Sequence, residues 1–116
     1  MSIKIGDMIK NINPNNRYFG RTFTVVAVDD HGYVCQCGIM YRDLYFFESE
    51  IEQIDSPPRF LPGTVVFPIN NRHPFMNMVY GIIETSNRLG SLVRVWEEYV
   101  QAHRVRYVSN RNLRAK

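Results

Sequence analysis

The most informative stretch of the chain is residues 22–37, which read TFTVVAVDDHGYVCQC. Its first seven residues are mostly β-branched or aromatic and have the length of one strand. Asp29-Asp30-His31-Gly32 then provides turn-forming residues, and we expect Gly32 to supply a positive φ in a tight hairpin turn. Tyr33–Cys37 follows as the returning strand. The stretch therefore predicts an antiparallel hairpin, which is the local unit of an all-β fold.

Shorter strand patterns lie on both sides of this hairpin. We expect a strand over Asp7–Ile12, and then a loop over residues 13–17 that is rich in turn-forming asparagine. After the hairpin, Met40–Phe47 has the pattern of a strand, Glu48–Glu50 that of a single helical turn, and Ile51–Ile54 that of a closing strand. No segment keeps a helical period over ten residues, so the first half of the chain predicts five strands and no long helix.

The second half of the chain repeats the pattern of the first half. Residues 5–9 align with residues 62–66 at an offset of 57, which brings Gly6 onto Gly63. The other aligned segments are 22–26 with 79–83, 33–37 with 91–95, and 44–47 with 105–108, at offsets of 57, 58 and 61. Gly32 falls on Gly90 in this alignment. Few residues are identical, so the shared apolar pattern and the two aligned glycines are what indicate an internal duplication.

Two glycine-containing motifs resemble the start of a known small barrel. Gly6-Asp7-Met8-Ile9, followed by Gly20 and the strand over residues 22–26, resembles the opening of KOW-like and Tudor-like members of the SH3-like superfamily. The second unit keeps Gly63 but has Asn77 where Gly20 would fall. The resemblance implies an all-β fold class, with two tandem small five-stranded SH3-like barrels packed against each other.

The chain divides into two units and a short linker. We assign residues 1–55 to an acidic barrel, residues 56–60 to a Pro-Pro linker and residues 61–116 to a basic barrel. Adjacent prolines favour an extended, semi-rigid spacer, which here is too short for wide separation. A unit of ~60 residues buries only about 60% of its unfolded surface and is marginally stable alone. We therefore expect the two barrels to share an interface.

The composition excludes several classes of protein. The 116 residues are 45% hydrophobic and 22% charged, unlike a disordered tail, a collagen-like fibre or a disulfide-dense toxin. No apolar run is long enough to cross a membrane, and residues 1–7 do not resemble a signal peptide. We therefore expect a cytoplasmic protein without a membrane partner, whose two cysteines are reduced.

The two halves differ in charge. Residues 1–57 carry five basic and eight acidic side chains, for a net charge of −3. Residues 58–116 carry nine basic and three acidic side chains, for a net charge of +6, and eight of the nine cations are arginine. Such asymmetry indicates different partners for the two halves. Arginine favours planar contacts with phosphate or carboxylate and stacking on aromatic rings.

Candidate catalytic and metal-binding residues form no known pattern. Cys35-Gln36-Cys37 with nearby His31 falls short of the four ligands that zinc usually takes. The alignment of the cysteines with Val93 and Val95 favours two small, buried, core-type residues. The three histidines are scattered along the chain, and no nucleophile and base are linked by spacing. We expect a non-enzymatic protein with no metal site and no cofactor.

The strongest functional signal is arginine that alternates with apolar residues on two strands of the second unit. If the valines on either side of Arg94 face the core, Arg94 and Trp96 face solvent. On the next strand, the alignment places Val105 and Tyr107 in the core and turns Arg104 and Arg106 to the same outer face. An aromatic ring among guanidinium groups suits base stacking with phosphate contact. The predicted nucleic-acid-binding residues are Arg94, Trp96, Arg104, Arg106, Arg111, Arg114 and Lys116.

This surface predicts a non-enzymatic nucleic-acid-binding or regulatory protein. Its partner would be DNA or RNA, held by mainly electrostatic and weakly sequence-selective contacts. The alternative for the arginines is a solvated strand face, with Trp96 placed in the core at the end of its strand.

A protein-interaction module is the alternative function. It would be an adaptor or inhibitor, of viral or mobile-element origin for instance, whose arginines meet an acidic protein surface. The first unit has more aromatic residues than a small barrel can bury. The candidate partner-binding residues are Tyr18, Phe19 and Tyr41 of the first unit and Phe75 in a loop of the second, although the rings of the first unit could instead cover the barrel mouth or pack on the other unit. An acidic decoy of nucleic acid is a third reading of the first unit.

Overall fold

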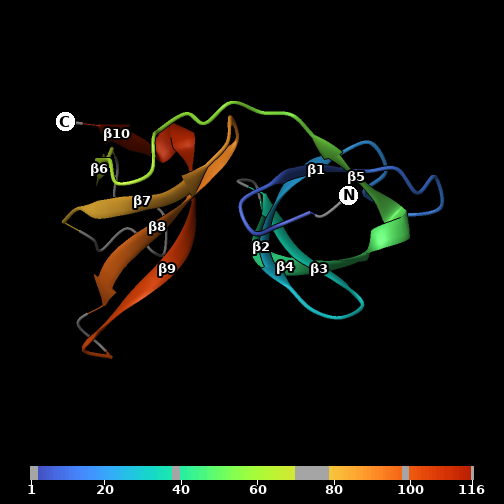
Figure 1. The fold of residues 1–116 in the computed structure, drawn as a ribbon, viewed down its shortest axis with the longest axis horizontal. Coiled ribbons are helices and arrows are strands. Elements are labelled where there is room, and N and C mark those ends of the chain that lie inside the picture. Colours follow the sequence, from blue (N-terminus) through green and yellow to red (C-terminus); the bar gives the residue numbers. More distant parts are fainter. Residues whose placement is uncertain (1–2, 38–39, 70–78, 98–99, 116) are drawn as a thin grey trace.

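The computed structural model describes residues 3–37, 40–69, 79–97 and 100–115, which form two five-stranded antiparallel sheets (Figure 1). The sheets lie side by side along the long axis of the molecule, and the linker passes from one to the other along one side (Figure 1). Two short 3-10 helices are the only helices among the described residues, so the predicted all-β class is confirmed. The sheets are not closed barrels.

The first sheet has the strand order β4-β3-β2-β1-β5. Its elements are β1 (Met8–Asn11), β2 (Thr22–Val28), β3 (Gly32–Cys37), β4 (Met40–Phe47), η1 (Glu48–Glu50) and β5 (Ile51–Ile54). The predicted hairpin is β2 and β3, and the predicted helical turn is η1. After η1 the chain returns to the start of the unit, where β5 pairs with β1.

The second sheet has the equivalent order β9-β8-β7-β6-β10. Its elements are β6 (Val65–Pro68), β7 (Gly81–Ser86), β8 (Gly90–Glu97), β9 (Ala102–Ser109), η2 (Asn110–Asn112) and β10 (Leu113–Ala115). A 3-10 helix again precedes the last strand, and that strand again pairs with the first strand of its unit.

Matching backbone bonds relate the two sheets position by position. Gly6 and Gly63 both have a positive φ, of 95° and 88°. The N–H of each donates to a carbonyl on the second strand of its unit, that of Val25 or Ile83, at 2.8 Å. A register shift follows Val25 and Ile83 alike in the pairing with the third strand. These features support the internal duplication and the alignment of Gly6 with Gly63.

The sequence alignment of the repeats is wrong by one residue at the second and fourth strands. Val25 and Ile83 hold equivalent register positions, which is an offset of 58 rather than 57. Phe46 and Val108 are also equivalent and both buried, which is an offset of 62 rather than 61. Apolar residues lie on both faces of β9, so the apolar pattern alone does not determine its register.

The two hairpin glycines make room for a tyrosine. The φ of Gly32 is not positive, so the prediction of a left-handed residue there is wrong. The Asp29 carboxylate closes the turn instead, because its Oδ1 accepts a hydrogen bond from the N–H of Gly32 at 2.8 Å. A Cβ at Gly32 would crowd the ring of Tyr45, and a Cβ at Gly90 would overlap the ring of Tyr107.

Each sheet has its own apolar core on one face, which we call the inner face; the opposite side is the outer face. In the first core, Cys35 is fully buried, and burial raises the pKa of its thiol to about 12. Cys37 is partly buried and packs against the same core. The second core consists of Phe60, Val66, Ile83, Val93, Val95, Val108 and Leu113. Phe60 was assigned to the linker from sequence, and its side chain packs with the second unit.

The two units meet through their outer faces. Met8, Leu92 and Tyr107 are buried but belong to neither core. Met8 is paired across the first sheet with Thr24, and Leu92 is paired across the second sheet with both Thr85 and Tyr107. Residues paired in this way point to the same side of a sheet. A Cβ on Gly6 would overlap the side chain of Thr85, so the two outer faces are in contact at this point.

Asn87 ties the second unit to the first. It lies in the β7–β8 turn, which reaches the first sheet (Figure 1), and its side chain is buried. Its Nδ2 donates to the carbonyl oxygen of Gly6 at 3.1 Å and to Thr24 Oγ1 at 3.0 Å. Its Oδ1 accepts from the N–H groups of Leu89 and Gly90 within its own turn. The same amide therefore shapes a turn and satisfies buried polar atoms of the other unit.

Gly6→Ala and Gly63→Ala form a matched pair that tests this interface. Both substitutions put an alanine at a positive φ, which costs about 1–2 kcal/mol each. Only Gly6→Ala also forces a methyl group against Thr85, which adds about 1–3 kcal/mol of overpacking. We expect urea denaturation to give the larger loss of unfolding free energy for Gly6→Ala. Equal losses would show that Gly6 is not packed against the second unit.

Candidate nucleic-acid interface

The register of β8 with β9 determines which side chains share a face of the second sheet. Arg94 is paired with Val105, and Trp96 is paired with His103. Between these pairs lie the pairs that point to the opposite face, such as Val95 with Arg104. Because paired residues point to the same side, the outer face carries Arg94, Trp96, His103 and Val105. We call these four residues the outer strip.

The predicted grouping of Arg94, Trp96, Arg104 and Arg106 on one face is wrong. Arg104 and Arg106 are paired with Val95 and Val93, whose side chains lie in the core, and so they belong to the inner face. The physical reason is the one-residue error in the repeat alignment. With the correct offset, Arg106 takes the place of Leu44, which packs against the first core, rather than that of an outward residue.

The same error misplaced two apolar residues. Val105 was predicted to face the core, yet it is 49% exposed and lies in the outer strip. Tyr107 is buried as predicted, but against the first unit and not in the second core. Burial raises the pKa of its hydroxyl. The prediction that Val93 and Val95 face inward while Arg94 and Trp96 face solvent is confirmed.

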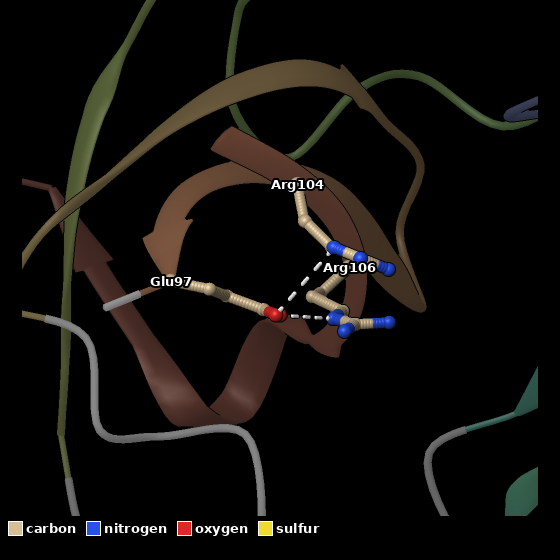
Figure 2. Close-up of polar contacts among 3 residues, drawn as sticks. All are labelled: Glu97, Arg104 and Arg106. Atoms are coloured by element: carbon tan, nitrogen blue, oxygen red, sulfur yellow. Dashed lines mark hydrogen bonds and ion pairs between the residues drawn. The ribbon is translucent and has the colours of Figure 1, made fainter. Parts of the chain in front are cut away.

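The two inner-face arginines share one carboxylate (Figure 2). Arg106 Nε donates to Glu97 Oε1 at 2.6 Å, and Arg104 Nε lies 3.7 Å from Glu97 Oε2. The hydrogen bond from Arg106 holds the pKa of Glu97 below its ordinary value, and the charges of both arginines add to this effect. Glu97 therefore compensates part of the positive charge at the end of the hairpin where β8 leads into β9.

The outer strip has an aromatic centre and a cationic edge. The indole of Trp96 is 47% exposed, and its ring meets that of His103 edge to face with centroids 5.1 Å apart. Arg94 Nη1 lies 3.4 Å from Glu84 Oε1, and both side chains are nearly half exposed. Such a surface ion pair is weak, so a phosphate can compete for the guanidinium.

The outer face continues across β6 and β10. Val65 is paired with Ile82, which is paired in turn with Arg94. Alternation along β6 puts Phe67 on the same side as Val65, and Arg114 is the partner of Phe67 on β10. The Arg114 guanidinium lies over the Phe67 ring, 5.3 Å from its centroid. A second exposed arginine thus stands on the same face as Trp96.

The other predicted site residues are scattered. Arg111 is exposed on η2, away from the strip, and Lys116 lies outside the described residues. Phe19 is 56% exposed, whereas Tyr18 is buried in the first core, where its hydroxyl accepts from Arg42 at 3.1 Å. The side chain of Tyr41 and all of Phe75 lie outside the described residues as well. Among described side chains, the predicted partner-binding patch is therefore reduced to Phe19.

Sequence reasoning missed His103, Val105 and Phe67. The signal that could have found the first two is Val108, whose match to Phe46 in the correct repeat alignment sets the face of every β9 residue. Phe67 corresponds to Lys10 at the offset of 57, so the repeat itself gives no sign of an aromatic residue there.

Metal ligands and membrane spans are the other site types considered for the described part of the chain. No three His, Cys, Asp or Glu side chains gather there as metal ligands. No helix in this part is long and apolar enough to cross a bilayer. The sequence matches no family model and no curated protein. The geometry of the outer strip is therefore the basis for assigning a function.

The placement of Arg104 and Arg106 on one face and of Arg94 on the other can be tested through the pKa of Glu97. We expect NMR titration of the Glu97 carboxyl to give a pKa below the ordinary value for glutamate. Arg106→Gln should raise it most, because that hydrogen bond is lost, and Arg104→Gln should raise it less. Arg94→Gln serves as the matched control and should leave it unchanged, because Arg94 pairs with Glu84 on the other face. A shift caused by Arg94→Gln would contradict the register.

Proposed function

We propose that the protein binds single-stranded nucleic acid through the outer face of its second sheet. The observation that carries the proposal is the half-exposed indole of Trp96, which lies on the same face as Arg94 and Arg114. An exposed aromatic ring stacks on unpaired bases of any sequence, and neighbouring arginines contact the phosphates. We infer DNA or RNA with weak sequence preference as the ligand.

The charge distribution supports binding of nucleic acid to the second unit rather than to the first. Residues 58–116 have a net charge of +6 and residues 1–57 a net charge of −3, so a polyanion is drawn to the second unit. Arg104 and Arg106 lie on the inner face and share Glu97, so the phosphate contacts proposed for the outer face are Arg94, whose ion pair with Glu84 is weak, and Arg114. Two or three neutralised phosphates on a single strand correspond to a slope of about −1.4 to −2 in log K against log salt.

The strand order supports a finer fold assignment within the same proposal. Each unit is a meander of four strands in which a fifth strand, preceded by a 3-10 helix, returns to the first. We infer that both are open variants of the SH3-like barrel, of the KOW-like or Tudor-like kind. The proposed role is non-enzymatic and cytoplasmic, with the first unit serving to orient the second.

Charge-matched double variants test the surface directly. We expect fluorescence anisotropy with labelled oligo(dT) and oligo(U) to show binding that weakens between about 50 and about 200 mM salt. Arg94→Ala/Arg114→Ala should weaken it clearly, whereas Arg104→Ala/Arg106→Ala removes the same formal charge from the inner face and should matter much less. No binding at low salt, or equal effects of the two pairs, would contradict the proposal.

Substitution of Trp96 tests the stacking contact. Trp96→Ala should raise the Kd for a single strand about 5- to 150-fold, which corresponds to the loss of ~1–3 kcal/mol per stacked base. Trp96→Phe keeps a stacking ring and should retain most of the affinity. If binding is absent and a stoichiometric protein instead survives nuclease treatment of a lysate, the outer strip serves an acidic protein partner.

A further inference from the structure

We propose that the protein associates head to tail with further copies of itself, by repeating between molecules the interface that joins its two units. This inference rests on the duplication and on the interface between the units, and it does not depend on nucleic-acid binding. It identifies one surface on each unit that the contact within the chain does not use. We infer that each of these surfaces binds another copy of this chain.

The interface within the chain uses different surfaces of the two repeats. The first unit contributes the outer row in which Thr24 is paired with Met8 and with Gln36. The second unit contributes the outer row in which Leu92 is paired with Thr85 and with Tyr107. At the offsets found in the structure these rows are not equivalent, so the contact is heterologous. A heterologous contact leaves its two counterpart surfaces unused and can be repeated indefinitely or closed into a ring.

The unused counterpart on the first unit is the row of Ala27, Val34 and Tyr45, which corresponds to Thr85, Leu92 and Tyr107. Tyr45 is 41% exposed, whereas its equivalent Tyr107 is buried against the other unit. Ala27 and Val34 are also partly exposed. This row has the same shape-determining features as its counterpart: a tyrosine over a hairpin glycine and an aliphatic centre.

The unused counterpart on the second unit is the row of Val65, Ile82 and Arg94, which corresponds to Met8, Thr24 and Gln36. Val65 is 39% exposed, whereas Met8 is buried in the interface. Gly63 stands where Gly6 stands in the first unit. A Cβ at Gly63 would meet no atom of the described residues within 4 Å, so none of them takes the place over Gly63 that Thr85 fills over Gly6.

A charge pair can form between molecules one strand away from the position that corresponds to the Asn87 hydrogen bonds within the chain. Asp29 is the equivalent of Asn87, because both close the hairpin turn of their unit. Asp29 cannot donate to the Gly63 carbonyl, which stands where Asn87 meets Gly6, and Ile82 replaces Thr24. Arg94, which is paired with Ile82, replaces Gln36 in the opposing row. A guanidinium there can pair with the Asp29 carboxylate. The acidic first unit of one molecule would thus meet the basic second unit of the next.

Association between molecules should be weak. Within the chain the short linker holds the two units together at an effective concentration in the mM range, and this advantage is absent between molecules. The contact should therefore form progressively as the protein concentration rises toward about 1 mM, and salt should weaken it because a charge pair replaces the hydrogen bonds of Asn87.

Two single-surface variants provide the decisive experiment, by sedimentation of the nucleic-acid-free full chain. Val34→Glu blocks the free surface of the first unit, and Val65→Glu blocks that of the second. Both introduce the same charge, so the altered surfaces cannot pair with each other. The unaltered protein should form oligomers that grow beyond a dimer at low salt and shrink at high salt. Each variant alone should be monomeric, and their equal mixture should form a dimer and nothing larger, since each supplies one intact surface.

Ile69→Glu is the matched control, because Ile69 is 55% exposed on the second unit but lies outside the proposed row. It should associate like the unaltered protein. Dimer formation in the mixture also shows that both variants are folded. The proposal is overturned if the unaltered protein stays monomeric up to about 1 mM at low salt. It is equally overturned if either variant alone still forms oligomers, or if the mixture stays monomeric. The sedimentation contains no nucleic acid, and Val34→Glu lies on the other unit from Trp96, so loss of self-association is distinguishable from loss of nucleic-acid binding.

Discussion

The two hydrogen bonds from the Asn87 amide to Gly6 and Thr24 are the contact on which the arrangement of the molecule depends. They cross between units that are each only about half of a 116-residue chain. A unit of that size has too little core for high stability alone. Burial of Met8 and Tyr107 around the same point adds apolar surface to the joint. The hydrogen bonds fix how the two units are oriented, since the buried amide is satisfied in only one position of one unit relative to the other.

This joint makes two similar repeats unequal. The outer face of the first sheet is covered where Met8 and Thr24 lie, whereas the equivalent part of the second sheet stays open around Val65 and Ile82. The same joint leaves Trp96 on a face that also carries two exposed arginines. The two repeats therefore share one fold. The contact between them determines which part of each outer face remains available to a ligand or to another molecule.

Much of the fold could be predicted from sequence, because strand length, β-branched content and turn residues act locally. The hairpin over residues 22–37, the 3-10 turn and the closing strand were all found in this way. The candidate site was predicted only in part. Arg94 and Trp96 alternate cleanly with buried valines, so their direction was readable. The direction of Arg104 and Arg106 was not, because it depends on a pairing register that Val108 sets through long-range packing.

The contact between the units was anticipated only as a general need for shared burial. Its residues could not be read from sequence, because Asn87 looks like an ordinary turn residue and Gly6 like an ordinary strand start. Their partnership exists only once both sheets have formed. It also explains why Tyr107 is buried on the face opposite to its own core.

Equilibrium unfolding followed by two probes tests most directly whether the units are one cooperative structure. The single tryptophan of the chain, Trp96, reports on the second unit alone, whereas far-UV circular dichroism reports on both sheets. A joint built around Asn87 predicts that the two signals change together through one urea transition, with one midpoint and one slope. A tryptophan transition separated from the dichroism transition would show that the units unfold independently and would contradict the account.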